Sequence, residues 1–329
     1  MGMFAAQDID IGEVIVAERP LIVAVGHMRQ SPYPFHHPWE LQRMVAERLT
    51  GKNREEFFAL HNCKGYTRPH VTGIMDTNAV GFRLGMSDYD AECQAVCKDI
   101  SRANHSCSPN AMWSWRLEAF ALEFRATWPI KKGEQVYARY SDIYEPREKR
   151  QKYLLERYKF KCICPSCTSD TSLSDRLRAM LKAASEANRC GDDSALLQWI
   201  KNPTLPDDKI LVQCRFMISI CDEERFYDGD TWPVWFERIV KAYCALEDEE
   251  KARMWAEKAA KLSKIGVGHD AGWGDVAKDP KNTNWWGLRS QTRSGVRLFQ
   301  SLDDFQIRDV LQGQGPRGLG AILPQFAST

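Results

Sequence analysis

The sequence predicts an α+β fold, in which a mixed N-terminal part precedes an all-helical C-terminal part. Strand-forming residues surround a glycine turn over Phe4–Val25, and a similar arrangement returns over 120–140, so both regions are expected to form paired strands. Farther along the chain, apolar residues recur at helical spacing, for example over 208–221 and 234–246. Short strands and hairpins are therefore expected first, and packed helices afterwards.

Composition excludes several classes of function. The formal net charge of the 329 residues is +1, so no strong field attracts the whole molecule to nucleic acid or to an anionic membrane. No apolar stretch is long enough to span a bilayer. The eleven cysteines are an odd number without a regular framework, which favours a reducing compartment and metal binding over disulfides. We expect a monomer in the nucleus or cytoplasm that binds neither membrane nor nucleic acid directly.

Helix signals and polar breaks divide the chain. Helices are expected over Trp39–Leu49 and Arg54–His61, inside a helical insertion at about 38–103. Arg147–Tyr158 has the pattern of a charged amphipathic helix that leads into a cysteine cluster. Ser174 is a plausible N-cap for the first C-terminal helix, and glycine, proline and polar residues predict irregular backbone after Gly266. The expected parts are 1–160, 161–168, a helical domain at 172–266, whose helices we place over 174–190, 208–221, 234–246 and 248–265, and a tail at 267–329.

Three ordered strings carry the most information. They are RANHSCSPN at Arg102–Asn110, IKKGE at Ile130–Glu134 followed by Tyr140, and YKFKCICPSC at Tyr158–Cys167. With the opening GMFA at Gly2–Ala5, they resemble the SET and post-SET motifs of protein lysine methyltransferases, most closely those of the SET-and-MYND branch. The resemblance covers roughly residues 1–168. It implies a SET-type β fold of short strands with a helical insert, and S-adenosylmethionine-dependent methylation of a lysine in a histone or non-histone protein.

A MYND zinc finger is not expected, because the segment 26–39 contains histidines but no cysteine. A metal site is expected elsewhere: Cys162, Cys164 and Cys167 offer three soft thiolate ligands on a short loop, and tetrahedral zinc takes four. The resemblance assigns the fourth position to Cys107. Four sulfurs leave no open position for water, so one structural zinc ion is predicted. A redox dithiol or buried free cysteines are the alternatives.

The resemblance also implies a cofactor site. Asn104 and the backbone around His105 would hold S-adenosylmethionine, with Gly2 allowing close approach of the first strand. Asn78 stands where relatives of the SET-and-MYND branch have a cofactor-binding asparagine, although it could instead cap a helix or turn. His105 could equally be a structural histidine with satisfied hydrogen bonds. The full cofactor-binding set that the resemblance implies is Gly2, Met3, Phe4, Asn78, Asn104, His105, Tyr140 and Phe160.

Catalysis is expected at Tyr140, which matches the essential tyrosine of the family. Phe160 would line the substrate channel, and Ala138, two residues before the tyrosine, would leave room for products beyond monomethyl-lysine. Without the resemblance, both aromatic residues would be ordinary core side chains. The alternative function is a catalytically inactive SET-fold module for protein interaction, because Gly2 is the only glycine present of the family's glycine-x-glycine start.

Overall fold

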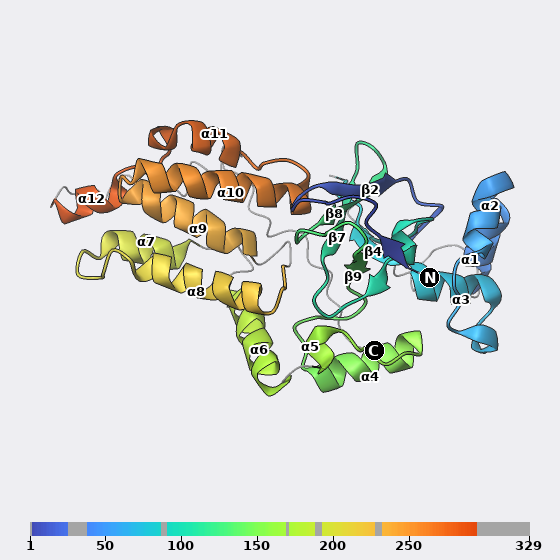
Figure 1. Cartoon of the computed structure of the whole chain (residues 1–329). Coiled ribbons are helices and arrows are strands. Elements are labelled where there is room, and N and C mark those ends of the chain that lie inside the picture. The colour runs from blue at the N-terminus through green and yellow to red at the C-terminus, as the bar shows by residue number, and fades with distance from the viewer. Residues whose placement is uncertain are drawn as a thin grey trace. The chain divides into compact units, whose positions relative to one another are not determined.

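The computed structural model describes residues 2–25, 38–86, 91–168, 171–187, 193–227 and 232–294 and forms two compact units, with the boundary after Arg178 (Figure 1). The strands, all in the first unit, are β1 (Met3–Phe4), β2 (Val14–Glu18), β3 (Ile22–Val25), β4 (Val80–Arg83), β5 (Glu92–Val96), β6 (Asn104–His105), β7 (Ala111–Arg116), β8 (Ala121–Ala126) and β9 (Gln135–Ala138). Its helices are α1 (Pro38–Glu47), α2 (Gly51–Phe58), η1 (Gly65–Thr67), α3 (His70–Asn78), η2 (Ile100–Arg102), α4 (Arg147–Tyr158) and α5 (Pro165–Thr168). Helix α6 (Thr171–Ala187) begins in the first unit and continues past the boundary.

Three small sheets make up the strand part of the first unit, in the orders β1-β9-β6, β2-β8-β7 and β3-β5-β4. The expected strands form, but the predicted pairings were wrong: β2 pairs with β8, β3 with β5, and β9 with β1 and β6. The two glycine turns pair with each other instead. Ile9 donates to the Ile130 carbonyl at 2.8 Å, and Ile130 donates back to Ile9 at 2.9 Å. Strands β2 and β3 therefore pair with strands far along the chain, whereas β8 also pairs with its sequence neighbour β7.

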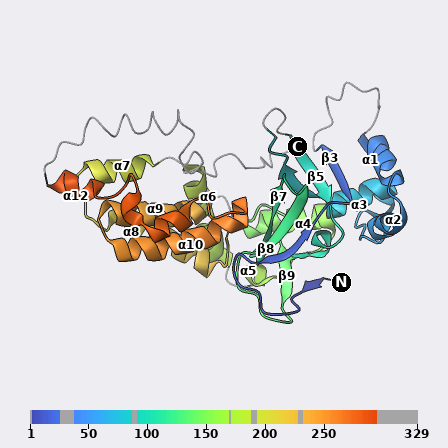
Figure 2. The same ribbon diagram turned by 90° about the horizontal axis from the view of Figure 1, so that it is seen from above.

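The segment between β3 and β6 contains the helices α1, α2 and α3, but also the strands β4 and β5, which the expected helical insertion at about 38–103 did not include. The predicted helices over Trp39–Leu49 and Arg54–His61 form as α1 and α2, each beginning slightly earlier. Figure 2 shows α1, α2 and α3 grouped beside β3 and β5. Phe57 and Ile74 are completely buried in the small core that they share with β3 and β5. This core holds the insertion against the sheet that precedes the Asn104–His105 strand.

Helix α4 covers the predicted Arg147–Tyr158 and ends at Lys159, which has left-handed backbone with φ of 64°. That turn reverses the chain so that Phe160 and the cysteine segment fold back toward the strands. Leu154 on α4 is fully buried with three of the cysteines. The local sequence thus predicts the helix, and the turn at its C-terminus positions the cysteine segment against Leu154.

The second unit is helical. Its described helices are α7 (Ser194–Lys201), α8 (Lys209–Glu223), α9 (Trp232–Ala245), α10 (Glu249–Val267), α11 (Trp273–Lys278), η3 (Pro280–Asn282) and α12 (Leu288–Arg293). The helices expected over 208–221, 234–246 and 248–265 are confirmed as α8, α9 and α10, whereas α7 was not predicted. Ser174 is not the N-cap of α6, because that helix begins at Thr171. None of the described helices is long and apolar enough to cross a membrane.

The prediction of irregular backbone after Gly266 was wrong for 273–293. Gly272 and Gly287 have φ of 83° and 70° and cap the N-termini of α11 and α12, so the glycines start short helices instead of ending order. Burial of Trp273 and Arg289 fixes these helices. The rest of the predicted tail, 295–329, lies outside the described residues.

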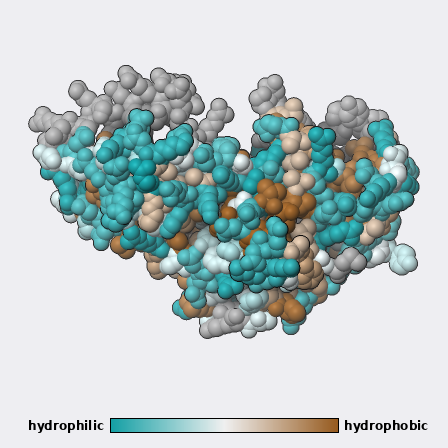
Figure 3. Space-filling model, turned by 45° about the horizontal axis from the view of Figure 1, so that its top comes forward, coloured by the Kyte–Doolittle hydropathy of each residue, from teal (hydrophilic) through white to brown (hydrophobic). Residues whose placement is uncertain are grey.

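The face of the molecule in Figure 3 is mainly hydrophilic, and hydrophobic residues gather over the strand-rich part of the first unit. The hydrophobic side chains of Phe4 on β1 and Val14 on β2 are exposed. They line a surface cavity of about 710 Å³, together with Gly2, Val16 and Arg102. The cavity follows the N-terminal strands.

Candidate functional site

The sheet β1-β9-β6 brings together three predicted site segments. In it β9 is the middle strand: Met3 lies opposite Val136 in antiparallel register, and His105 lies opposite Ala138 in parallel register. Ser106 donates its backbone N–H to the Ala138 carbonyl at 3.0 Å, which extends the pairing beyond β6. The start of the chain, the Asn104–His105 strand and the residues before Tyr140 are therefore neighbours.

Gly2 lies tightly against this sheet. A Cβ built on Gly2 would come within 2.0 Å of Gln135 Nε2 and 2.8 Å of Asn104 Nδ2, closer than side-chain atoms tolerate. A larger residue at this position would push the Gln135 and Asn104 side chains aside, so glycine lets the backbone meet the Asn104 amide where it lies. The polar amides beside an exposed backbone are donors and acceptors of the kind that a polar cofactor needs. This close approach fits the cofactor role that the resemblance implies for Gly2 and Asn104.

Tyr140 lies at the centre of an aromatic cluster. Its ring centroid is 4.8 Å from that of Tyr158, 5.4 Å from that of His105 and 6.5 Å from that of Phe160. The hydroxyl donates a 2.6 Å hydrogen bond to the carbonyl of Ala103, which is buried. Burial raises the pKa of Tyr140 to about 12, and the nearby Cys63 thiol adds to the rise. The phenol is therefore a neutral, oriented group at neutral pH.

His105 links Tyr140 to the cysteines. Its Nδ1 accepts the backbone N–H of Tyr140 at 3.0 Å, which leaves the ring proton on Nε2, 3.3 Å from Cys107 Sγ. Burial lowers the pKa of His105 to about 4, so the ring is neutral and can fill both roles. The side chain of His105 therefore acts as a structural histidine with satisfied hydrogen bonds, and its backbone is part of strand β6.

Four cysteines form a cluster whose geometry suits a metal. The Sγ atoms of Cys107, Cys162, Cys164 and Cys167 all lie within 4.8 Å of one another. Tetrahedral zinc–sulfur bonds of about 2.3 Å separate sulfurs by about 3.8 Å, and the Cys107 and Cys167 sulfurs are 3.5 Å apart. Hydrogen bonds from the three neighbouring thiols lower the pKa of Cys164, while the same contacts raise the pKa of Cys107. The donor set is the one that zinc prefers.

Arg150 lies against this cluster and is almost completely buried. Burial opposes its charge, but the nearby Cys107 and Cys167 sulfurs outweigh this effect and raise the pKa of Arg150. Its Nε and Nη2 atoms are buried and have no hydrogen-bond partner among the described residues. Metal-bound thiolates are acceptors that would satisfy such donors, so this observation also fits a charged metal centre.

Asn78 does not join the aromatic cluster through its side chain. It is buried at the end of α3, and its Nδ2 donates to the carbonyls of His61 at 2.6 Å and Ile74 at 2.7 Å. The amide therefore holds the end of the helix against the 61–64 turn, as the capping alternative expects. Its Oδ1 accepts no hydrogen bond from the described residues and is the one atom left for a ligand.

Sequence reasoning missed three residues beside the tyrosine. Tyr158 packs directly on Tyr140, Lys64 Nζ lies 5.8 Å from the centroid of the Tyr158 ring, and the Cys63 thiol is close enough to affect the Tyr140 pKa. The spacing of Tyr158 and Phe160 around one residue was a usable signal for a shared aromatic wall. No signal in the sequence places the 61–64 turn here.

The surface cavity along β1 and β2 is lined by only some of the predicted site residues. Its lining includes the predicted cofactor residues Gly2, Met3 and Phe4, but none of Asn104, His105, Tyr140 or Phe160. We place the candidate site at the aromatic cluster, because there the polar atoms and the rings converge. Ala138, buried on β9 next to His105, also belongs to this part of the structure.

Comparison with known proteins identifies the first part of the chain. Residues 1–141 match the family model of the SET domain. The histone-lysine N-methyltransferase set5 of Schizosaccharomyces pombe is 30% identical over 171 residues, which are 51% of this chain and 47% of the relative. The human N-lysine methyltransferase SMYD2 is 28% identical over 132 residues, which are 40% of this chain and 30% of that protein. The chain thus spans less than half the length of these curated relatives.

A solved structure, the SET domain of LSMT bound to lysine and AdoHcy, aligns with 95% of this chain and 91% of its own at 13% identity. Its TM-score is 0.31, too low to bear on the assignment. The structure shows short strands in the part that matches the SET domain and helices in the C-terminal part, so the predicted α+β fold class is confirmed. This chain therefore carries a SET domain, and its relatives include the SET-and-MYND lysine methyltransferases.

Proposed function

We propose that this protein transfers a methyl group from S-adenosylmethionine to the side-chain amine of a lysine in another protein. The observation that carries the proposal is the convergence of Tyr140, His105 and Asn104 around strand β9, beside a glycine that permits close backbone approach. The named relatives are lysine methyltransferases, one of them acting on histones. The acceptor is therefore a protein lysine, on a histone or on another protein.

Cofactor binding would use the polar edge of the β1-β9-β6 sheet. Asn104 and the backbone of His105 and Gly2 would hold the cofactor, with Phe160 packing against it. Met3 and Phe4 continue the strand at this edge, and Asn78 would add its remaining acceptor, Oδ1. When bound, S-adenosylmethionine supplies an electrophilic methyl group on a positively charged sulfur.

The chain's own residues must deliver a neutral, aligned amine and exclude water. Tyr140 keeps its proton on the Ala103 carbonyl, so its hydroxyl oxygen can accept a hydrogen bond from the incoming amine without acting as a base. The rings of Tyr140, Tyr158 and Phe160 form an apolar wall that disfavours an ammonium group and lowers the pKa of a lysine that enters. The lysine ammonium thus gives its proton to bulk water as it enters the site, before methyl transfer, and the tyrosine orients the neutral amine that remains.

Ala138 bears on the number of methyl groups added. Its side chain is small and apolar, so it neither fills space near Tyr140 nor holds a water molecule there. We infer that dimethyl-lysine or trimethyl-lysine can form. Mass spectrometry of a substrate at long reaction times tests this, and a product that stops at monomethyl-lysine would contradict it.

Zinc would be structural in this scheme. Cys107, Cys162, Cys164 and Cys167 would bind one ion with no coordination position left for substrate or water. Such an ion would fix Phe160, which precedes the cysteines, and the loop after His105. Its removal would disturb the site without removing a reacting group.

Calorimetric titration of S-adenosylmethionine into the zinc-loaded full chain tests the proposal. The Asn104→Ala variant should lose binding by about tenfold or more, since it removes hydrogen bonds at the centre of the site. Asn53→Ala, an exposed asparagine on α2, is the matched control and should bind like the wild type. Absence of binding to folded wild type, or equal binding by Asn104→Ala, would contradict the proposed site and favour a non-catalytic interaction module.

A further inference from the structure

Two arginines are enclosed beside the cysteine cluster. Arg178, on α6, is 0% exposed, and Arg150, on α4, is 1% exposed. Burying a guanidinium is costly unless hydrogen bonds and opposite charge compensate it. Nothing in the helical pattern of either segment predicts these positions, so their burial calls for a physical reason.

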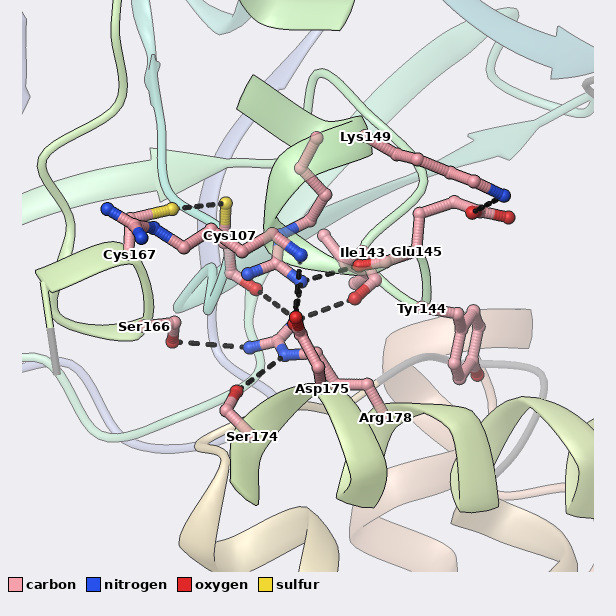
Figure 4. A network of polar contacts seen from close by, with 12 residues as sticks. Cys107, Ile143, Tyr144, Glu145, Lys149, Ser166, Cys167, Ser174, Asp175 and Arg178 are labelled. Atoms are coloured by element: carbon pink, nitrogen blue, oxygen red, sulfur yellow. Dashed lines mark hydrogen bonds and ion pairs between the residues drawn. The ribbon is translucent and has the colours of Figure 1, made fainter. Parts of the chain in front are cut away.

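Every nitrogen of the Arg178 guanidinium donates at least one hydrogen bond to a residue near the cysteine cluster. Nη1 donates to the Cys107 carbonyl at 2.9 Å and to the Ile143 carbonyl at 2.6 Å. Nη2 donates to the hydroxyls of Ser108 at 3.1 Å and Ser166 at 3.2 Å, and Nε to Ser174 at 3.3 Å. Figure 4 shows the side chain reaching from α6 toward Cys107. One residue thus joins both cysteine-bearing loops, 107–108 and 164–167.

Asp175, one helical turn before Arg178 on α6, contacts Arg150 and the first residue of α4. Its Oδ1 accepts the backbone N–H of Arg147 at 2.8 Å and lies 3.7 Å from Arg150 Nη1. The same arginine donates to the Glu145 carbonyl at 2.5 Å. Helix α6 therefore holds the cluster with two side chains from one face, Asp175 through Arg150 and Arg178 directly.

The positive charge of the two arginines would balance the negative charge of the cysteine cluster with zinc bound. Four thiolates and one divalent ion sum to a net charge of about −2, and two guanidinium groups sum to about +2. Asp175 adds a negative charge, but its side chain is 29% exposed, so water shares in solvating it. The serine and carbonyl partners of Arg178 satisfy its hydrogen bonds while leaving its charge available to the sulfurs.

We propose that Arg150 and Arg178 are outer-shell residues of a zinc–tetrathiolate centre, whose charge they balance, and that Arg178 makes helix α6 an integral part of that centre. The inference rests on the zinc site of the proposed function. It extends that site to a residue outside both the SET-domain match and the cysteine motif. Loss of outer-shell partners commonly weakens metal affinity about 10–100-fold.

Competition for zinc against a chelator of known affinity tests the proposal on the full chain. Arg178→Gln keeps hydrogen-bonding capacity but loses the charge, and should weaken zinc affinity about 10–100-fold. Arg178→Lys keeps the charge but loses the planar fork, and should lie between Arg178→Gln and the wild type. Arg176→Gln, an exposed arginine on the same helix, is the matched control and should leave affinity unchanged.

Equal affinity of wild type and Arg178→Gln would overturn the proposal, and equal loss in Arg178→Gln and Arg178→Lys would overturn its charge argument. Should the glutamine variant fail to fold, as judged by circular dichroism, equal zinc affinity of Arg178→Lys and wild type would overturn the role of Arg178 in joining α6 to the centre. A wild type without bound zinc would also refute it. Titration of S-adenosylmethionine into the same samples reports separately on the proposed methyl transfer.

Discussion

The hydroxyl of Tyr140 is the most direct test of the proposed chemistry. Tyr140→Phe keeps the ring among its aromatic neighbours and removes one oxygen, which donates to the Ala103 carbonyl at 2.6 Å. Losing this buried hydrogen bond should lower the free energy of unfolding by only about 1–2 kcal/mol. Losing an oriented polar group that acts at the reacting atoms should slow methyl transfer by about 10²–10³-fold, equivalent to about 3–4 kcal/mol.

Binding and rate should separate in this variant. Calorimetry should give an S-adenosylmethionine affinity within about threefold of the wild type, because an interaction made only in the transition state does not affect ground-state binding. Single-turnover transfer of a labelled methyl group, with core histones as one trial acceptor and lysine-rich non-histone proteins as another, should show the fall in rate. Tyr153→Phe, a half-exposed tyrosine on α4, should show neither effect.

The pH dependence makes the prediction sharper. A pKa of about 12 leaves only about one Tyr140 hydroxyl in ten thousand ionised at pH 8. The rate should therefore rise with pH in both wild type and Tyr140→Phe, as more substrate amine becomes neutral, and the two profiles should be parallel. A pH dependence that disappears in the phenylalanine variant would show that the tyrosine is a base, and a rate within about threefold of wild type would refute its catalytic role.

Three further predictions concern single side chains. Gly2→Ala should displace the Asn104 amide, which lies 2.8 Å from the added Cβ, and weaken S-adenosylmethionine binding in calorimetry, whereas Gly81→Ala, with open space around it, should not. Lys159→Gly should stabilise the protein toward urea by about 1 kcal/mol by removing the strain of a left-handed residue, and an unchanged midpoint would contradict this. Burial raises the pKa of Glu237 in the folded state, so its stabilising contribution is present at low pH and lost as pH rises through the folded pKa. Glu237→Gln should therefore raise the melting temperature at pH 8 but not at pH 4, and the same difference at both pH values would contradict the argument.

The features predictable from sequence are those that depend on near neighbours. The three cysteines at 162, 164 and 167 lie on one loop, so their proximity follows from spacing alone, and α4 follows from a helical pattern twelve residues long. The fourth cysteine, Cys107, was assigned by resemblance, and the structure brings it to the other three. Helices α8, α9 and α10 are long enough for their periodicity to be read.

Strand partners were not predictable in the same way. A two-residue strand such as β1 or β6 carries no periodicity, and the alternation in β8 fits any neighbour that buries the same face. Glycine misled in the opposite direction after Gly266, since the same residue can end a helix or begin the next one. Arg178 was hidden because a charged residue within an amphipathic helix is normally solvated, and only the folded chain shows what surrounds it.

The central position of β9 has a consequence for how the protein acquires its site. Strands β1 and β6 both pair with β9, so Met3 and Asn104 have no strand partner until Val136 and Tyr137 have been synthesised. During synthesis from the N-terminus, the ribosome will have made more than a third of the chain before these pairs can close, and Cys107 then waits for Cys167. Such nonlocal closure is slow compared with helix formation. A nascent chain therefore cannot retain cofactor or metal until its second half is emerging, and mutations that slow β9 pairing should affect yield before they affect activity.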